Sequence, residues 1–447
     1  MKTYKVILIA MSGVRVFNKK LFNIGLTLPG FVDRSKVIAS LPSLGLLTLA
    51  AHTPKNWKII YKELDNFTED DIINILQEKP DIIAFSSLTP RIYETYQLSE
   101  RFRKNGIKVV IGGLHVSALP EEAKNYADTI VQGEGEIIWE TLLNDYTNNS
   151  LKSFYSSISE PKYTFNFENC RVPKYELLDI SKYNRLTIQA TRGCPRNCNF
   201  CAASKTISSY KKKPIQLIKK DLDKIFEIWE EPFIELADDN TFVDKNWSKK
   251  LLKLFANYKM KWFTETDISV ADDDELLELL AKSNCMQVLI GLESVNSESL
   301  KTLDNGWKYD HFQNYSKAID KIQSYGITVN GCFVLGFDTD TIETFKETEK
   351  FIKSSNLSDV QITILTAFPG TDLYLQLEKE GRLLSNCWNK CTLFDATFIP
   401  KNFTVEELEN EFQKLMAAVY SKDLVKKRKE IFKQTMQNKK NLIEHSF

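Results

Sequence analysis

Over the first third of the chain, short apolar runs rich in β-branched residues alternate with segments in which apolar residues recur at helical spacing. Runs of this kind predict buried strands, and the helical spacing between them predicts amphipathic helices. This alternation favours an α/β fold, a doubly wound, open parallel sheet in which ligands bind beyond the carboxyl ends of the strands. The predicted strands are YKVILIAM (4–11), WKIIYKEL (57–64), DIIAFSS (81–87), IKVVIGG (107–113) and TIVQGEG (129–135).

The segments between these strands carry helix start and stop signals. Residues 68–79 and 91–106 combine helical spacing with early acidic residues and a terminal Lys or Gly. We assign residues 1–145 to this Rossmann-like first domain. Residues 146–184 are polar and irregular, which indicates a linker.

A second series of strand and helix patterns begins at residue 185. Residues 272–284 and 310–326 have the apolar spacing of amphipathic helices. Six strand candidates without two more predict a partial (β/α)6 barrel over residues 185–384, open on one side. These candidates are RLTIQA (185–190), FIELA (233–237), KWFTET (261–266), QVLIGLE (287–293), ITVNGCFVLG (327–336) and VQITIL (360–365).

The remaining residues, 385–447, are predicted to form a helical C-terminal domain. Thr404 and Glu407 have the spacing of a capping box, and apolar residues recur at helical spacing after them. The basic run KKRKE (426–430) is interpreted as a solvated helix face.

Composition narrows the class of protein. The 447 residues are 43% hydrophobic and 26% charged, which predicts a soluble, multidomain globular protein. Lys plus Arg and Asp plus Glu both number 59, so no nucleic-acid partner is expected. No apolar run has the length of a transmembrane segment, and the opening residues lack a signal-peptide cleavage pattern. Five of the eight cysteines are scattered, which favours reduced thiols and a cytoplasmic protein.

The other three cysteines, Cys194, Cys198 and Cys201, lie within TRGCPRNCNFCAAS (191–204), after the first strand of the second series. Thiolates at this spacing do not share one regular helix or strand, so we expect a loop that wraps a common centre. A closed zinc site needs a fourth ligand, and no further Cys or His is near in sequence. The three cysteines are better matched to a 4Fe–4S cluster with one iron open to a small molecule.

The CxxxCxxC spacing, Phe200 before the third cysteine and the preceding TRGCP resemble the radical S-adenosylmethionine (SAM) enzymes. The resemblance implies that Cys194, Cys198 and Cys201 hold the cluster and that SAM chelates the open iron. It also implies that one electron, from a donor such as flavodoxin or ferredoxin, cleaves SAM to give a 5′-deoxyadenosyl radical.

The resemblance also implies SAM contacts at the ends of the later strands. ELADDN (235–240) falls where the family binds the SAM amino group, although a plain polar turn is the alternative interpretation. TETDIS (264–269) and GLES (291–294) supply carboxylates for the methionyl group or the ribose hydroxyls. GCFVLGFDTDT (331–341) resembles the glycine motif near the adenine. The implied residues are Asp238, Asp239, Asn240, Glu265, Glu293 and Gly336.

The first domain resembles the cobalamin-binding domain that precedes the barrel in one subclass of these enzymes. The resemblance rests on LPSLGLLTLAA (41–51), FSSLTP (85–90), IGGLHVSALPEEA (111–123) and VQGEGE (131–136). In that subclass such small and polar loops line the cobalamin pocket, because glycines let the backbone approach a bulky ring. The implied contacts are Ser86, Ser87, Thr89, Gly112, Gly113, His115, Gly133 and Glu134.

Two patterns known from related proteins are missing. The DxHxxG loop that gives a histidine to cobalt is absent, and His52 and His115 lack its context. Cobalt is then expected to have no histidine from this motif, or the domain is a vestigial fold without cobalamin. The three cysteines that methylthiotransferases carry ahead of the barrel are also absent, and Cys387 and Cys391 are interpreted as buried thiols.

The resemblance implies a cobalamin-dependent radical SAM methyltransferase that transfers methyl from methylcobalamin to an unactivated carbon. The alternatives are a radical SAM enzyme for cyclisation, carbon–carbon coupling or rearrangement, with or without cobalamin, and a cluster that serves only as a redox sensor or a structural element. Residues 388–408 look like the C-terminal segment of a branch that includes hopanoid and other lipid methylases. The substrate is expected to be a small molecule, a lipid or a peptide.

Overall fold

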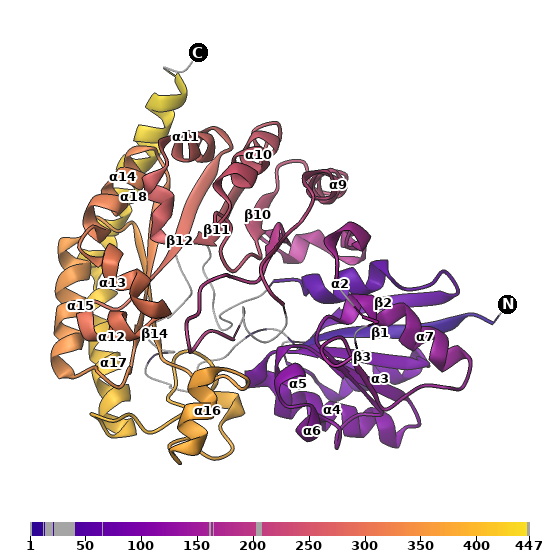
Figure 1. Ribbon diagram of the computed structural model, residues 1–447. Helices are drawn as coiled ribbons and strands as arrows, with labels where there is room; N and C mark the ends of the chain where they lie inside the picture. Colours follow the sequence, from indigo (N-terminus) through magenta and orange to yellow (C-terminus); the bar gives the residue numbers. More distant parts are fainter. Residues whose placement is uncertain are drawn as a thin grey trace.

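The computed structural model describes residues 2–11, 13, 21, 41–64, 66–160, 162–163, 165–202 and 208–444. Ala203 and Ser204, at the end of the cysteine stretch, lie outside these residues. Two parallel sheets dominate the molecule, and their carboxyl ends face each other (Figure 1). We call the region between these ends, which includes Leu114 and Asp239, the seam. None of the helices in the described part of the chain is long and apolar enough to cross a membrane.

The first sheet has six parallel strands in the order β2-β1-β3-β4-β5-β6. This order confirms the predicted doubly wound sheet. β6 lies within the predicted linker, so that segment contributes an edge strand to the first sheet, paired with β5. The boundary at residue 145 itself remains a prediction. The strands are β1 (Tyr4–Met11), β2 (Trp57–Glu63), β3 (Ile82–Ser87), β4 (Lys108–Gly112), β5 (Thr129–Gln132) and β6 (Phe154–Ser156).

Side-chain alternation along β1 builds the two cores of the first domain. Ile7 and Ile9 point into one core, whereas Val6 and Leu8 point into the other. Successive strand residues face opposite sides of a sheet, so a continuous apolar run indicates a strand that is covered on both faces. The covering helices are α2 (Leu44–Ala51), α3 (Glu69–Gln77), α4 (Ile92–Lys104), α5 (Leu114–Ala118), α6 (Pro120–Ala123) and α7 (Trp139–Thr147).

The second sheet has six parallel strands in the order β14-β13-β12-β11-β10-β7. Each strand pairs with the next strand of the series, and β7 and β14 form the two edges. This arrangement confirms the predicted partial barrel. The strands are β7 (Leu186–Ile188), β10 (Phe233–Leu236), β11 (Lys261–Thr266), β12 (Cys285–Glu293), β13 (Thr328–Leu335) and β14 (Asp359–Ile364).

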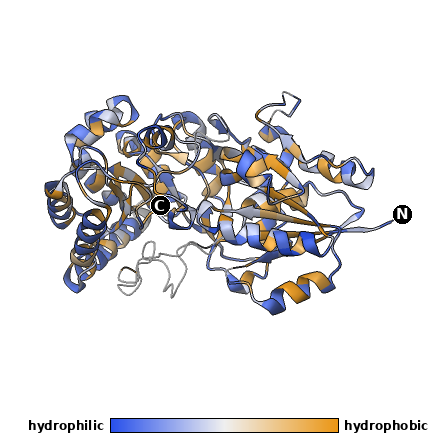
Figure 2. Ribbon diagram, turned by 90° about the horizontal axis from the view of Figure 1, so that it is seen from below, coloured by the Kyte–Doolittle hydropathy of each residue, from blue (hydrophilic) through white to orange (hydrophobic). Residues whose placement is uncertain are grey.

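Helices cover the outer face of the second sheet, and polar residues dominate the molecular exterior (Figure 2). The helix predicted over residues 310–326 is two helices, because Asn314 adopts non-helical dihedral angles (φ −103°, ψ 0°). The break separates the part that reaches the seam from the part that packs on the sheet. The helices are α9 (Ile215–Phe226), α10 (Lys245–Phe255), α11 (Asp274–Lys282), α12 (Ser297–Thr302), α13 (Trp307–Phe312), α14 (Tyr315–Ser324), α15 (Ile342–Ser354) and α16 (Asp372–Lys379).

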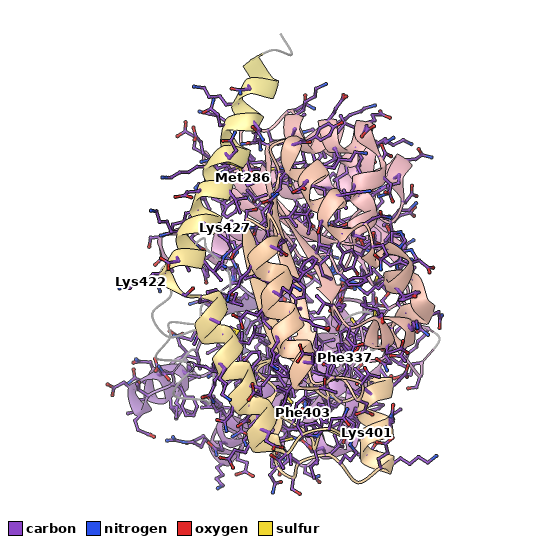
Figure 3. All side chains as sticks on the ribbon, turned by 90° about the vertical axis from the view of Figure 1, so that its left-hand side faces the viewer. Met286, Phe337, Lys401, Phe403, Lys422 and Lys427 are labelled. Carbon is purple, nitrogen blue, oxygen red and sulfur yellow. The ribbon has the colours of Figure 1, made fainter. Side chains whose placement is uncertain are left out.

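The C-terminal helices α17 (Val405–Val419) and α18 (Lys422–Glu444) run along the outside of the barrel (Figure 3). The predicted capping box is confirmed, because the backbone N–H groups of Glu407 and Thr404 donate to each other's side chains at 3.1 and 2.8 Å. The expectation that the tail is helical from residue 385 is wrong for 385–403. That segment contains one short turn, Trp388–Lys390, and is held by contacts with both domains.

Candidate functional site

Two cavities lie at the carboxyl ends of the two sheets. The front cavity, of about 410 Å³, is lined by loops of the first domain and by the segment before Cys194. The barrel cavity, of about 530 Å³, lies inside the second sheet. Leu114 and Asp239 line both cavities, so the two spaces adjoin. Cavities of this size suit small ligands and cofactors.

The cysteine loop begins beyond β7 and the short strand β8 (Thr191–Arg192), and it lies at the wall of the barrel cavity. Cys198 and Cys201 line this cavity, whereas Cys194 accepts a long contact from Asn240 Nδ2 at 3.9 Å. None of the chain's eight cysteines forms a disulfide. Burial raises the pKa of Cys198 to about 12. Cys198 is therefore a protonated thiol, and a metal cluster would have to displace its proton.

Asp238 fixes the start of the cysteine segment rather than facing either cavity. Its Oδ1 accepts the backbone N–H groups of Ala190 and Thr191 at 2.8 and 2.9 Å, and its Oδ2 accepts the Thr241 hydroxyl at 3.1 Å. Burial raises the pKa of this carboxyl to about 7, although these hydrogen bonds oppose the shift. Asp238 is thus a positioning residue for the loop.

Asp239 and Asn240, the next two residues, do face the cavities. Asp239 lines both spaces, and Asn240 lines the barrel cavity. The Asn240 side chain donates to Asp267 at 2.9 Å, and Asp267 pairs with Arg196 at 3.0 Å. The Arg196 guanidinium lies 3.6 Å from the centroid of the Trp307 ring. This chain of contacts joins β10, β11, the cysteine loop and α13.

Glu265 and Glu293 line the barrel cavity in different electrostatic settings. Glu293, at φ 64°, accepts from Lys308 Nζ at 3.0 Å, and Lys308 also donates to the Gly291 carbonyl at 2.7 Å. Glu265 is open to the cavity but is otherwise surrounded by protein. Its burial, and then the nearby carboxylates of Glu235 and Asp239, raise its pKa to about 8. This shift favours the neutral form of Glu265, which can donate a hydrogen bond.

Five of the eight residues predicted to contact cobalamin line the front cavity: Ser86, Gly112, Gly113, Gly133 and Glu134. Thr89 and His115 instead line the barrel cavity. Ser87 lines neither, because its hydroxyl is engaged with Thr95 and the Leu88 carbonyl.

Gly336, predicted to lie near the adenine, also lies outside both linings. It occupies a buried turn at φ 108°, and its N–H donates to Asp340 at 2.9 Å. The positive φ explains why a glycine is needed at this position. Gly336 therefore shapes the turn after β13, and a role at the adenine stays a prediction.

His115 connects the first domain to the C-terminal segment. Its Nε2 lies 3.2 Å from Glu122 Oε1, and the Trp388 indole N–H donates to Glu122 Oε2 at 3.1 Å. The rings of His115 and Trp388 meet edge to face at 5.2 Å. His52, in contrast, accepts the backbone N–H of Arg171 at 3.4 Å and lines neither cavity.

Several cavity residues carried no recognisable signal in the sequence. Lys308 reads as an ordinary lysine of a helix, and Arg196 as one of several polar residues in a loop. Leu393 lines the barrel cavity with φ 72°, a conformation that costs a non-glycine residue roughly 1–3 kcal/mol. Strain of this size is sustained when surrounding contacts fix the backbone, and here the Ile364 N–H donates to the Leu393 carbonyl at 2.7 Å.

Three family models match parts of the chain. The Radical SAM superfamily matches residues 188–352, the B12 binding domain matches residues 32–143, and a domain of unknown function (DUF4070) matches residues 371–445. The first two together cover more than half of the chain.

Curated relatives align with most of the chain. The bacteriochlorophyllide d C-12(1)-methyltransferase of Chlorobaculum tepidum is 27% identical over 400 residues, covering 87% of this chain and 84% of that protein. The hopanoid C-2 methylase of Rhodopseudomonas palustris is 27% identical over 366 residues, covering 78% of this chain and 66% of that protein. The second match agrees with the expected likeness to the hopanoid branch.

Solved structures share the architecture at low sequence identity. TsrM from Kitasatospora setae, a radical SAM methyltransferase solved with cobalamin and a [4Fe-4S] cluster bound, has a TM-score of 0.66 at 14% identity, covering 85% of this chain and 78% of that chain. OxsB, solved with aqua-cobalamin and SAM, has a TM-score of 0.61 at 18% identity and 85% coverage of this chain. The chain spans only 56% of the OxsB chain. These similarities concern the fold.

Replacing Asp238 tests its role in holding the cysteine segment. Asp238→Ala leaves the buried N–H groups of Ala190 and Thr191 without an acceptor, at a cost of roughly 1–3 kcal/mol for each unpaired group. Asp238→Asn keeps an oxygen in place and is the matched control. We expect thermal unfolding at a clearly lower temperature for Asp238→Ala only, and equal stability of the two variants would contradict this role.

Proposed function

We infer that this chain, which belongs to the radical SAM superfamily and to its subclass with a cobalamin-binding domain, is a methyltransferase that acts on an unactivated carbon. The observation that carries the inference is the meeting of the front and barrel cavities at Leu114 and Asp239, beside the cysteine loop. A C–H bond on such a carbon is not appreciably acidic, so its methylation needs radical chemistry. Adjoining sites for a methyl carrier and a radical source meet that need.

Cys194, Cys198 and Cys201 are proposed to hold the cluster. Their thiols are free of disulfides, share one loop, and lie at or near the barrel cavity. When bound, the cluster and SAM supply a 5′-deoxyadenosyl radical, and methylcobalamin supplies the methyl group. The protein's own contribution is to bind and orient these groups and to keep water from the radical.

The barrel cavity offers complementary groups for SAM. Asp239 and Glu293 are acceptors for amino and hydroxyl groups, and Asn240 and Glu265 add hydrogen-bonding capacity beside them. Lys308 is the proposed donor to the SAM carboxylate, because it is buried and its charge is held in place by Glu293. Although burial lowers the pKa of Lys308, the Glu293 carboxylate raises it above its ordinary value, so the ammonium form persists.

The front cavity offers a surface that fits a corrin. Its predicted contacts are mostly glycines and a serine, which leave room for a large ring at the ends of β3, β4 and β5. Gly113 and Gly133 have positive φ, and a Cβ on Gly113 would lie 3.3 Å from the Ser87 carbonyl oxygen. His115 is already engaged by Glu122, so its Nε2 is not a free ligand for cobalt.

The rest of the barrel cavity suits a neutral substrate with an apolar skeleton. Arg196 and Lys308 both line it, and each is paired with a carboxylate. Leu289, Phe368 and Leu393 supply apolar wall, so an anionic substrate would find little compensation among the described residues. We propose a small molecule, or a small part of a lipid or peptide.

The reductant and the compartment follow from the same chemistry. A flavodoxin or ferredoxin is the proposed electron donor, because the cluster accepts one electron at a time. A cytoplasmic location is proposed because none of the eight cysteines forms a disulfide.

Replacing a cluster cysteine distinguishes a catalytic cluster from a purely structural one. Cys201→Ala is expected to abolish reductive SAM cleavage while keeping the fold, because the loop loses one of three ligands. Anaerobic assay of 5′-deoxyadenosine, with circular dichroism for the fold, checks this result. Cys170→Ala, which changes a half-buried thiol outside both cavities, is the matched control and should cleave SAM normally. Unfolding of Cys201→Ala alone would favour the structural role.

Methyl transfer can be tested before the substrate is known. The reconstituted protein, with hydroxocobalamin, a strong reductant and SAM carrying a deuterated methyl group, is expected to form deuterated methylcobalamin. Absorbance and mass spectrometry detect this product, and a mixture without protein is the control. Protein that binds cobalamin yet forms no methylcobalamin would count against methyl transfer and in favour of the alternative radical reactions.

The raised pKa of Glu265 predicts a pH dependence of stability. Between the ordinary pKa of 4.5 and about 8, the folded state holds a proton that the unfolded state has lost, so this group lowers stability as pH rises. Glu265→Gln removes the titration. In urea unfolding of the metal-free protein, the variant should gain stability relative to the wild type from pH 5 to pH 8. A constant difference across this range would show that Glu265 does not titrate there.

A further inference from the structure

Arg192 bridges the two domains beside the front cavity. It lies two residues before Cys194, and its guanidinium reaches back to the loop that follows β5. Nη1 donates to Glu134 at 3.2 Å, and Nη2 pairs with Glu136 at 2.8 Å. All three residues line the front cavity. One side chain thus joins the cysteine segment to the loop predicted to contact cobalamin.

The Arg192 side chain is held by hydrogen bonds and aromatic rings as well as by its ion pairs. Gln189 Oε1 accepts from Nη2 at 2.8 Å and from Nε at 3.2 Å. The guanidinium carbon lies 4.0 Å from the centroid of the Phe165 ring and 5.4 Å from that of Phe167. The Arg192 side chain is 19% exposed. A planar guanidinium held by paired hydrogen bonds and aromatic faces has little freedom to move.

The backbone on both sides of the contact is also fixed. Gly193, which connects Arg192 to Cys194, has φ 74°, and a Cβ there would lie 2.7 Å from the Ser208 carbonyl oxygen. Across the seam, the Glu134 N–H donates to Ser157 at 2.6 Å. Both ends of the Arg192 contact therefore lie in conformationally restricted backbone.

We propose that Arg192 is a positioning residue that couples the cobalamin site to the cluster, so that occupancy of the front cavity sets the geometry of the cysteine loop. This proposal rests on the proposed function, because it requires both cofactors in one chain. Arg192 is not an anion-binding residue: Glu134 and Glu136 already compensate its charge. Coupling of this kind is reciprocal, so SAM and cobalamin should each change the other's affinity by the same factor.

The test uses the reconstituted full chain with cob(II)alamin and the reduced cluster. Each carries an unpaired electron, and their magnetic interaction falls steeply with separation, so EPR reports their relative placement without any turnover. We expect the wild type to show this interaction and Arg192→Gln to show a weakened or broadened one. The factor by which cobalamin changes SAM affinity should fall at least about fivefold in the variant, the lower end for coupled sites.

Three further variants separate positioning from simple destabilisation. Arg192→Lys keeps the positive charge but loses the planar guanidinium that donates to two carboxylates at once, so it should show more coupling than Arg192→Gln but less than the wild type. The double variant Arg192→Gln/Glu136→Gln relieves one of the two acids that Arg192→Gln leaves without a cation, so it should regain part of the stability but not the coupling. Arg185→Gln breaks another well-buried ion pair, with Glu235, that lines neither cavity, and it should lose stability with the coupling intact.

The outcomes are distinguishable. Suppose that Arg192→Gln binds both cofactors and shows the same EPR interaction and the same affinity coupling as the wild type. That result would overturn the role of Arg192 and leave the proposed methyltransferase function standing. A wild type that binds no cobalamin would overturn the proposed function itself. If Arg192→Gln loses cobalamin altogether, Glu136→Ala, which removes the shorter of the two contacts that Arg192 makes across the domains, provides the measurement, and unchanged coupling in it would again refute the proposal.

Discussion

The structure depends on one geometric constraint: every strand of a parallel sheet ends at the same edge. Two such sheets meet here with those edges opposed, so loops far apart in sequence share one seam. The strands need only supply a rigid, apolar frame, which their continuous hydrophobic runs do. Chemical variety is then confined to the loops, and the two cavities arise where the loops of both sheets approach each other.

Electrostatic balance at the seam is achieved by pairing buried charges. The barrel cavity holds more carboxylates than cations, and burial alone would make several ionised acids costly there. Arg196 and Lys308 compensate the charges of two of these acids, and the raised pKa of Glu265 favours its neutral form. Asp238 is protected differently, by backbone N–H donors that also anchor the cysteine segment. The same groups therefore stabilise the loops and leave defined donors and acceptors facing the cavity.

The C-terminal segment completes the barrel cavity from outside the second sheet. Thr392 and Leu393 line the cavity, and the contact of Trp388 with Glu122 ties this segment to the first domain. Part of the cavity wall is thus built by residues that belong to neither sheet.

The sequence alone determined the strand series, the partial barrel and the cysteine loop, because these features depend on the local periodicity of apolar residues and on the close spacing of three cysteines. It also indicated Asp239, Asn240, Glu265 and Glu293, which lie in or just after the last residues of strands and do face the barrel cavity. Only the tertiary structure decided that Asp238 and Ser87 are engaged internally, and that Lys308 and Arg192 reach the cavities. The reason is that contacts between residues far apart in sequence depend on how the helices and strands pack. The residues next to a lysine or arginine in the sequence do not indicate which carboxylate it will pair with. The same holds for β6, too short to show a period of its own, which becomes a strand only because the edge of β5 is there to pair with it.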